Sequence, residues 1–124
     1  MITYLTKGER LWLWGRRWGK DNAGIGETYG ASAKVVSHWL HTLDDEDVPE
    51  VALKEPIQKW ELIAIARRRQ GWSIREMARR LGVSHVTLIN RERGGGDWME
   101  VWLWWRAKGW PPPPLISGYR RRDK

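Results

Sequence analysis

Hydrogen-bonding and apolar side chains lie close together between residues 84 and 90. Asn90 has an amide that can bond adenine in two places, while Val86 and Ile89 have methyl groups that suit the methyl of thymine. At helical spacing these three side chains point away from Leu88, which is expected to point inward. Side chains of these types on one face of a short helix are typical of contact with base edges in the major groove of DNA.

The residues before this segment predict a second short helix and a tight turn. Ser73 and Glu76 have the spacing of a capping box, in which each side chain bonds a free amide at the start of a helix. Gly82 suits the turn, because glycine adopts positive φ at little cost. Ala78 is small enough to let the two helices cross closely. Two short helices joined in this way favour a helix-turn-helix.

The run from Met77 to Gly94 resembles the Cro/repressor (XRE-like) family of phage and bacterial regulators. The matching residues are Met77, Ala78, Leu81, the turn Gly82-Val83-Ser84, Thr87-Leu88 and the closing Glu92-Arg93-Gly94. Arg91 stands where the family usually has an apolar residue, and insertion-sequence transposases carry a similar run. The resemblance implies a DNA-binding transcription regulator whose second motif helix enters the major groove.

Residues 21–40 repeat this pattern 52 positions upstream, with Gly30 at the position of Gly82. Small Gly26 falls where Ala78 lies, which preserves a close helix crossing. This segment also resembles Cro/repressor-like proteins, through Val36-Ser37-His38-Trp39 followed by Val48-Pro49. The sequence therefore predicts a tandem, divergent repeat, and the alternative is one motif beside a chance likeness.

We expect an all-α fold with two small, repressor-like helix-turn-helix units in tandem. The first unit is predicted over residues 1–55 and the second over 56–110, where it includes a Trp-rich closing helix. A Pro-rich linker and a basic tail are predicted over residues 111–124, because four consecutive prolines favour an extended spacer. An acidic loop is predicted at residues 44–47.

Further helices are predicted around the two motifs. Thr6 and Glu9 indicate a capping box that opens a helix from Lys7 to about Trp18. A short helix is predicted over residues 49–55, and another over 57–70 with Pro56 at its start. The final helix is expected to begin at an Asp97 cap and to end at Gly109. The expected inward faces are Leu11, Trp14 and Trp18 in the first helix, and Leu62, Ile65 and Ala66 packing against Met77, Leu81 and Leu88 in the second unit.

The predicted DNA-binding residues lie on the second helix of each motif and on the arginines around the second motif. Arginines at these places would bind phosphates, which position a protein without reading sequence. The first motif supplies Ser32, Ala33, Lys34, Ser37 and His38; the second supplies Ser84, His85, Val86, Thr87, Ile89 and Asn90; the arginines are Arg75, Arg79, Arg91 and Arg93.

The composition suggests an anionic partner. The 124 residues include 22 Lys and Arg against 15 Asp and Glu, a net charge of +7, which favours nucleic acid first and an acidic membrane surface second. No cysteine is present, so disulfides and thiolate metal sites are excluded. No signal peptide and no apolar run near the ~20 residues of a membrane helix is visible. We therefore expect a bacterial cytoplasmic protein without a cofactor, a metal or a membrane partner.

The sequence favours a regulator over other classes of protein. No carboxylate pair or histidine cluster suggests an enzyme, and a recombinase would need a catalytic domain for which the chain has no room. The alternatives are a DNA-packaging protein similar to a small terminase subunit, a transposition or recombination accessory, and a protein–protein adaptor or antitoxin. The 11 tryptophans predict subunit contacts, in a homodimer or a higher oligomer. The expected contact residues are Trp98, Trp102, Trp104 and Trp105.

Overall fold

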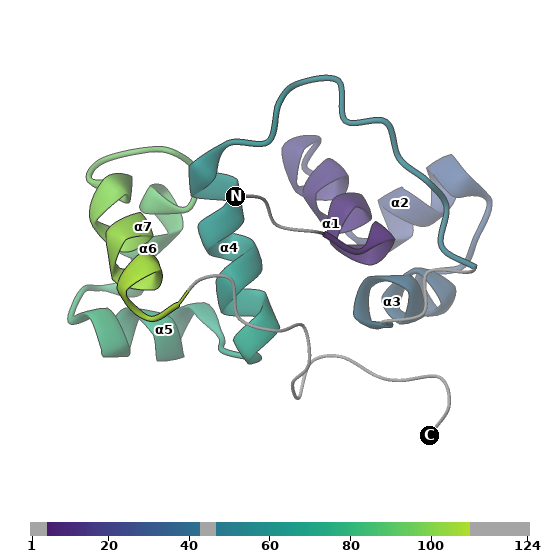
Figure 1. Cartoon of the computed structure of the whole chain (residues 1–124). Helices are drawn as coiled ribbons and strands as arrows, with labels where there is room; N and C mark the ends of the chain where they lie inside the picture. Colours follow the sequence, from purple (N-terminus) through teal and green to yellow (C-terminus); the bar gives the residue numbers. More distant parts are fainter. Residues whose placement is uncertain (1–4, 43–46, 110–124) are drawn as a thin grey trace. The chain divides into compact units, whose positions relative to one another are not determined.

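The computed structural model describes residues 5–42 and 47–109, and this part of the chain contains seven α-helices and no strand (Figure 1). The all-α prediction is therefore confirmed for the described residues. These residues form two compact units, and the division between the units falls between Glu55 and Pro56. The predicted Pro-rich linker and basic tail, and most of the predicted acidic loop, lie outside the described residues.

The first unit contains α1 (Lys7–Arg17), α2 (Asn22–Tyr29) and α3 (Ala33–His41). The predicted capping box of α1 is confirmed: the Glu9 amide donates to Thr6 Oγ1 and the Thr6 amide donates to Glu9 Oε1, both at 3.0 Å. Ser32 caps α3, because its Oγ accepts a hydrogen bond from the Val35 amide at 3.2 Å. The three helices therefore begin at side chains that satisfy free amides.

The core of the first unit lies between its three helices and the segment that follows them. The buried residues of this cluster are Leu11, Ile25, Val36, Leu40, Val48 and Val51. The prediction that Trp18 belongs to the inward face of α1 is wrong, since Trp18 is 68% exposed. Its backbone is the C-cap of α1 and lies outside the helix, so the helical spacing no longer applies.

The predicted helix over residues 49–55 is also wrong, because this segment has no regular secondary structure. Val48 and Val51 are buried in the core without it. β-Branched side chains lower helix propensity, and the residues before Pro49 and Pro56 are pushed away from helical backbone angles. The segment therefore covers the core without forming a helix or a strand.

The second unit contains α4 (Lys59–Gln70), α5 (Ile74–Leu81), α6 (His85–Arg91) and α7 (Trp98–Ala107). Gly71 and Gly82 end α4 and α5 with φ of 76° and 75°, as the sequence predicted. Pro56 does not start α4, because the helix begins at Lys59, after the N-cap Gln58. Asp97 is the N-cap residue of α7, as predicted, but its side chain makes no capping hydrogen bond.

The core of the second unit joins α4, α5, α6 and α7. Its buried residues are Ile63, Ala66, Met77, Ala78, Leu88, Val101 and Trp105. Ala66 lies in the predicted place, but Leu62 and Ile65 are not part of this cluster, and Ile63 takes their role. Residues 62–66 are all apolar, so their pattern alone does not indicate which of them face the core.

The helices of the two units recur at a constant spacing. Helices α4, α5 and α6 begin at residues 59, 74 and 85, each 52 positions after the starts of α1, α2 and α3 at 7, 22 and 33. Core residues follow the same spacing, as in the pairs Leu11 and Ile63, Ile25 and Met77, and Val36 and Leu88. The repeat seen in the motifs therefore extends through three helices of each unit.

Two glycines of α2 should respond oppositely to alanine. A Cβ on Gly26 would overlap the carbonyl oxygen of Ala31, whereas a Cβ on Gly24 would come no closer than 3.3 Å to its nearest neighbour, the Cβ of Lys20. We expect Gly26→Ala to lower the free energy of unfolding by about 1–3 kcal/mol. Gly24→Ala should be neutral or stabilising by up to about 1 kcal/mol, because alanine favours helix. Urea denaturation of both variants tests this, and equal effects would contradict it.

Candidate nucleic-acid interface

Helix α6 has one buried face and one exposed face. Ser84 starts the helix, because its Oγ accepts from the Thr87 amide at 3.1 Å and its hydroxyl donates to Thr87 Oγ1 at 2.9 Å. Leu88 is fully buried against α5 and α7, as predicted. On the opposite face Val86 is 63% exposed and Ile89 is 39% exposed. Exposed aliphatic side chains on so short a helix suit contact with an apolar group of a partner.

The remaining predicted residues of α6 differ in exposure. Ser84 and Asn90 are exposed, while His85 and Thr87 are half-buried. The Asn90 amide lies against the backbone of Gly95, where a Cβ would overlap it. The carbonyl of Asn90 also accepts a hydrogen bond from the Gly95 amide at 2.9 Å. The glycine loop after α6 therefore holds Asn90 in place at the end of the helix.

The arginines around the motif divide into two groups. Arg75 and Arg93 are exposed. Arg79 Nη2 donates to Glu76 Oε2 at 2.6 Å, and Arg91 Nη1 donates to Glu100 Oε1 at 3.1 Å. These carboxylates partly neutralise Arg79 and Arg91. Arg75 and Arg93 are therefore the better candidates for binding phosphates near α5 and α6.

The predicted capping box of α5 is only half formed. Ser73 Oγ accepts from the Glu76 amide at 3.0 Å, as expected. The Glu76 carboxylate binds Arg79 and also Arg80, whose Nε lies 2.8 Å from Glu76 Oε2. Two guanidinium groups one helical turn away attract the carboxylate more strongly than a single amide does. The same hydrogen bond from Arg79 is the main reason that the pKa of Glu76 lies below its ordinary value.

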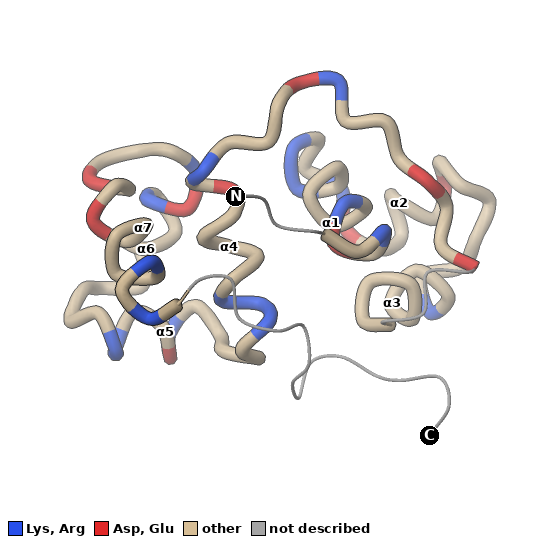
Figure 2. Tube along the Cα trace, in the orientation of Figure 1, with Lys and Arg blue, Asp and Glu red and all other residues tan. Residues whose placement is uncertain are grey.

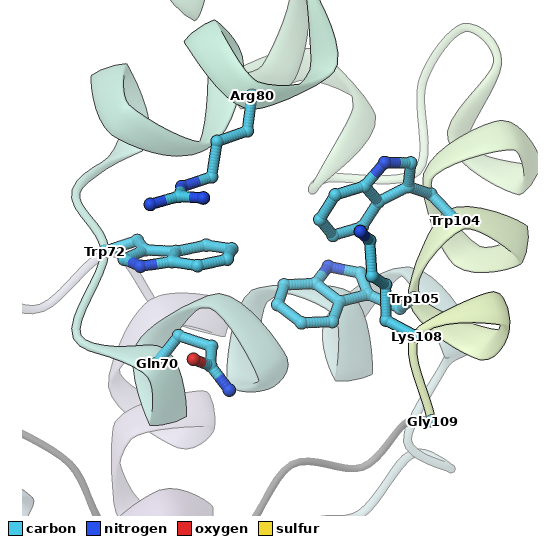
Figure 3. Close-up of a pocket in the computed structure, with 7 residues that line it drawn as sticks. All are labelled: Gln70, Trp72, Arg80, Trp104, Trp105, Lys108 and Gly109. Carbon is cyan, nitrogen blue, oxygen red and sulfur yellow. The ribbon is translucent and has the colours of Figure 1, made fainter.

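Arg80 takes part in a stack that the sequence analysis missed (Figure 3). Its guanidinium carbon lies 4.1 Å from the centre of the Trp72 ring, and Trp72 stacks on Trp105 with ring centres 5.7 Å apart. The stack borders an open pocket of about 240 Å³, which Gln70, Trp104, Lys108 and Gly109 also line. It connects α5 to α7 through the turn residue Trp72, and so holds the first motif helix in place.

A buried ion pair connects the first and third helices of the second unit. Arg67 Nε donates to Glu92 Oε2 at 2.8 Å and Arg67 Nη2 donates to Glu92 Oε1 at 3.2 Å. Glu92 is only 2% exposed, and Arg67 Nη1 also donates to the carbonyl of Trp72 at 3.1 Å. The sequence analysis missed this pair, although Glu92 was one of the residues that matched the family pattern. A bidentate pair fixes both the distance and the orientation of its two helices.

The corresponding face of the first unit is formed by α3. Ser32, Ala33, Lys34 and His38 are exposed, whereas Ser37 is half-buried. Val35, which was not predicted, is also exposed. Most of the residues predicted on α3 and α6 are therefore exposed.

Three of the four tryptophans that were expected to form subunit contacts pack inside their own unit. Trp105 is buried, and Trp102 and Trp104 pack against the core of the second unit. Trp98 is half-buried. This use of the rings explains the abundance of tryptophan in α7 without a second subunit.

Within residues 5–42 and 47–109, no three His, Cys, Asp or Glu side chains gather into a group that could hold a metal ion. None of the helices in the described part of the chain has the length and apolar character that a membrane crossing requires.

Comparison with known families supports this description of the second unit. Residues 63–97, from α4 to the start of α7, match the family model described as helix-turn-helix. The match supports a helix-turn-helix domain similar to those of the XRE family over these residues. No curated protein and no solved structure matches the chain. Domains of this family are DNA-binding and regulatory, so the match supports a DNA-binding regulator in general terms.

The ion pair of the helix-turn-helix domain gives a stability prediction. Arg67→Met should lower the free energy of unfolding by about 3–5 kcal/mol, because it removes both guanidinium hydrogen bonds that Arg67 donates to the buried Glu92 carboxylate. The double variant Arg67→Met with Glu92→Leu should recover most of this loss, because two apolar side chains avoid the cost of burying charge.

Urea denaturation measures both changes, and amide hydrogen exchange shows whether protection is lost in α6. A double variant that is no more stable than Arg67→Met alone would contradict the prediction.

The Glu76 pairs give a prediction of pH dependence. Since the pKa of Glu76 is lowered, its pairs with Arg79 and Arg80 are present above the ordinary value of 4.5 and are lost as the pH falls through the lowered pKa. Carboxyl NMR should show a Glu76 midpoint below 4.5. Arg79→Ala should move the midpoint upward more than Arg80→Ala, because the Arg79 hydrogen bond is the larger cause. Equal shifts would contradict this order.

Proposed function

We propose that the chain is a sequence-specific, double-stranded DNA-binding transcription regulator of phage or bacterial type. The observation that supports this most is the exposed face of α6, on the second helix of a helix-turn-helix domain. A helix in this position enters the major groove of DNA, where Val86 and Ile89 suit thymine methyl groups. By occupying a promoter operator, the chain would block or recruit RNA polymerase in the cytoplasm of its host.

The charge of the helix-turn-helix domain supports a nucleic-acid partner. Arg75 and Arg93 are exposed near the two motif helices, and Figure 2 shows further basic positions in the unit that contains α4–α7. Salt-sensitive contacts between such arginines and phosphates supply much of the affinity for DNA. Base contacts from α6 would then supply the discrimination between sequences.

The packing of the tryptophans favours a regulator over a ring-forming packaging protein. The packaging alternative rested on a Trp-rich helix that offers rings to neighbouring subunits. Trp102, Trp104 and Trp105 instead pack with the core of their own unit. We therefore propose no packaging, recombination or adaptor role and no catalytic activity.

Selection from random duplexes, followed by binding measurements at several salt concentrations, tests the proposed function. We expect a preferred sequence and an affinity that falls steeply with salt. Val86→Ala with Ile89→Ala should weaken binding to that sequence by about 1–3 kcal/mol through lost thymine contacts. Both residues are exposed and alanine favours helix, so the domain should remain folded.

The matched control is Leu103→Ala, which also truncates an exposed aliphatic side chain but lies on α7, outside the motif. It should leave the affinity unchanged. A protein that selects no duplex at low salt, or a control that weakens binding as much as the α6 variant, would contradict the proposal.

A further inference from the structure

The two repeats share a scaffold but differ in the charge of their first motif helices. The 52-residue spacing pairs Ala23, Glu27 and Thr28 of α2 with Arg75, Arg79 and Arg80 of α5. All six residues are exposed. The first motif helix of the first unit therefore carries an acidic side chain and two neutral ones where the second unit carries three arginines.

The end of the recognition helix shows the same difference. Trp39 and His41 of α3 correspond to Arg91 and Arg93. Trp39 packs against the core of the first unit, and the Nδ1 atom of His41 lies 2.8 Å from the carbonyl oxygen of Ser37, within hydrogen-bonding distance. Neither residue provides the permanent positive charge of an arginine to a partner.

The total charge is divided just as unevenly between the two parts of the sequence. Residues 1–55 contain 7 Lys and Arg and 9 Asp and Glu, a net charge of −2. Residues 56–124 contain 15 Lys and Arg and 6 Asp and Glu, a net charge of +9. The two net charges add up to the +7 of the whole chain. Figure 2 shows acidic positions along the segment that follows α3. The positive charge that suggested a nucleic-acid partner therefore comes from the second part alone.

Phosphate contacts supply the affinity and the orientation on which base contacts depend. A recognition helix without them has little to hold it in a groove that is lined with negative charge. We infer that the second repeat alone binds DNA, and that the first repeat keeps the helix-turn-helix scaffold without contacting the duplex. One chain then covers a single half-site, and an operator with two half-sites needs two chains. This inference rests on the proposed function.

Variants at equivalent positions of the two repeats test the inference directly. Lys34→Ala with His38→Ala changes α3 at the positions that correspond to Val86 and Asn90 in α6. This α3 double variant should change the dissociation constant for the selected duplex by no more than about twofold. It should leave the selected sequence unchanged. Val86→Ala with Asn90→Ala should weaken binding at least about tenfold. An α3 pair that weakens binding as much as the α6 pair would overturn the inference.

An exchange of surface charge tests its physical cause. Ala23→Arg with Glu27→Arg gives the first repeat two of the arginines of the second, and should make the salt dependence of DNA binding steeper. Arg75→Ala with Arg79→Glu makes the reverse change, and should weaken binding at least about tenfold. Circular dichroism checks that each variant is folded. An unchanged salt dependence in the first variant would overturn the explanation by missing arginines.

Failure of the proposed function and failure of the assignment of DNA binding to the second repeat give different results. If the unmodified chain binds no duplex at low salt, the proposed function fails. If it binds a selected duplex but the α3 pair changes the affinity or the preferred sequence, only the assignment to the second repeat fails. A single half-site bound by one chain, measured as the stoichiometry by native mass spectrometry, supports the inference.

Discussion

The ion pair between Arg67 and Glu92 is the constraint on which the candidate interface depends. Helix α6 has seven residues, too few to hold its own conformation in water, so its position depends on contacts at both ends. Ser84 fixes the first end through its cap, and Glu92 fixes the other by binding Arg67 on α4. Leu88 anchors the middle in the core. The exposed face is therefore presented by a helix that is held at three points.

Local chemistry in the sequence was enough to predict most of the helices that position this face. Serine caps and glycine turns act within a few residues, so Ser84 and Gly82 could be assigned without knowledge of the fold. The inward position of Leu88 followed from helical spacing for the same reason. Caps, turns and helical spacing together were therefore enough to predict most of the exposed side chains of α6 and α3.

Features that depend on distant residues could not be predicted in this way. The partner of Glu92 lies 25 residues away, and no local pattern indicates it. The Glu76 carboxylate had two possible uses, a cap or an ion pair with Arg79 and Arg80, and spacing alone does not choose between them. The face of α4 was ambiguous because residues 62–66 are all apolar. The 52-residue offset was visible in the sequence, but the exposure of the charged residues at equivalent positions became known only from the structure.

The two repeats stabilise the same crossing of helices by different chemistry. The positions that correspond to Arg67 and Glu92 are occupied in the first unit by Gly15 and Leu40. Leu40 belongs to the apolar core, and Gly15 leaves room for the Ile25 side chain, whose Cδ1 would lie 2.7 Å from a Cβ there. A hybrid unit that joined α1 to α5 and α6 would place a glycine opposite the Glu92 carboxylate and would lose the bidentate contact that Arg67 provides. Helices that occupy equivalent places in the two repeats are therefore not interchangeable, because each crossing is built for its own partner residue.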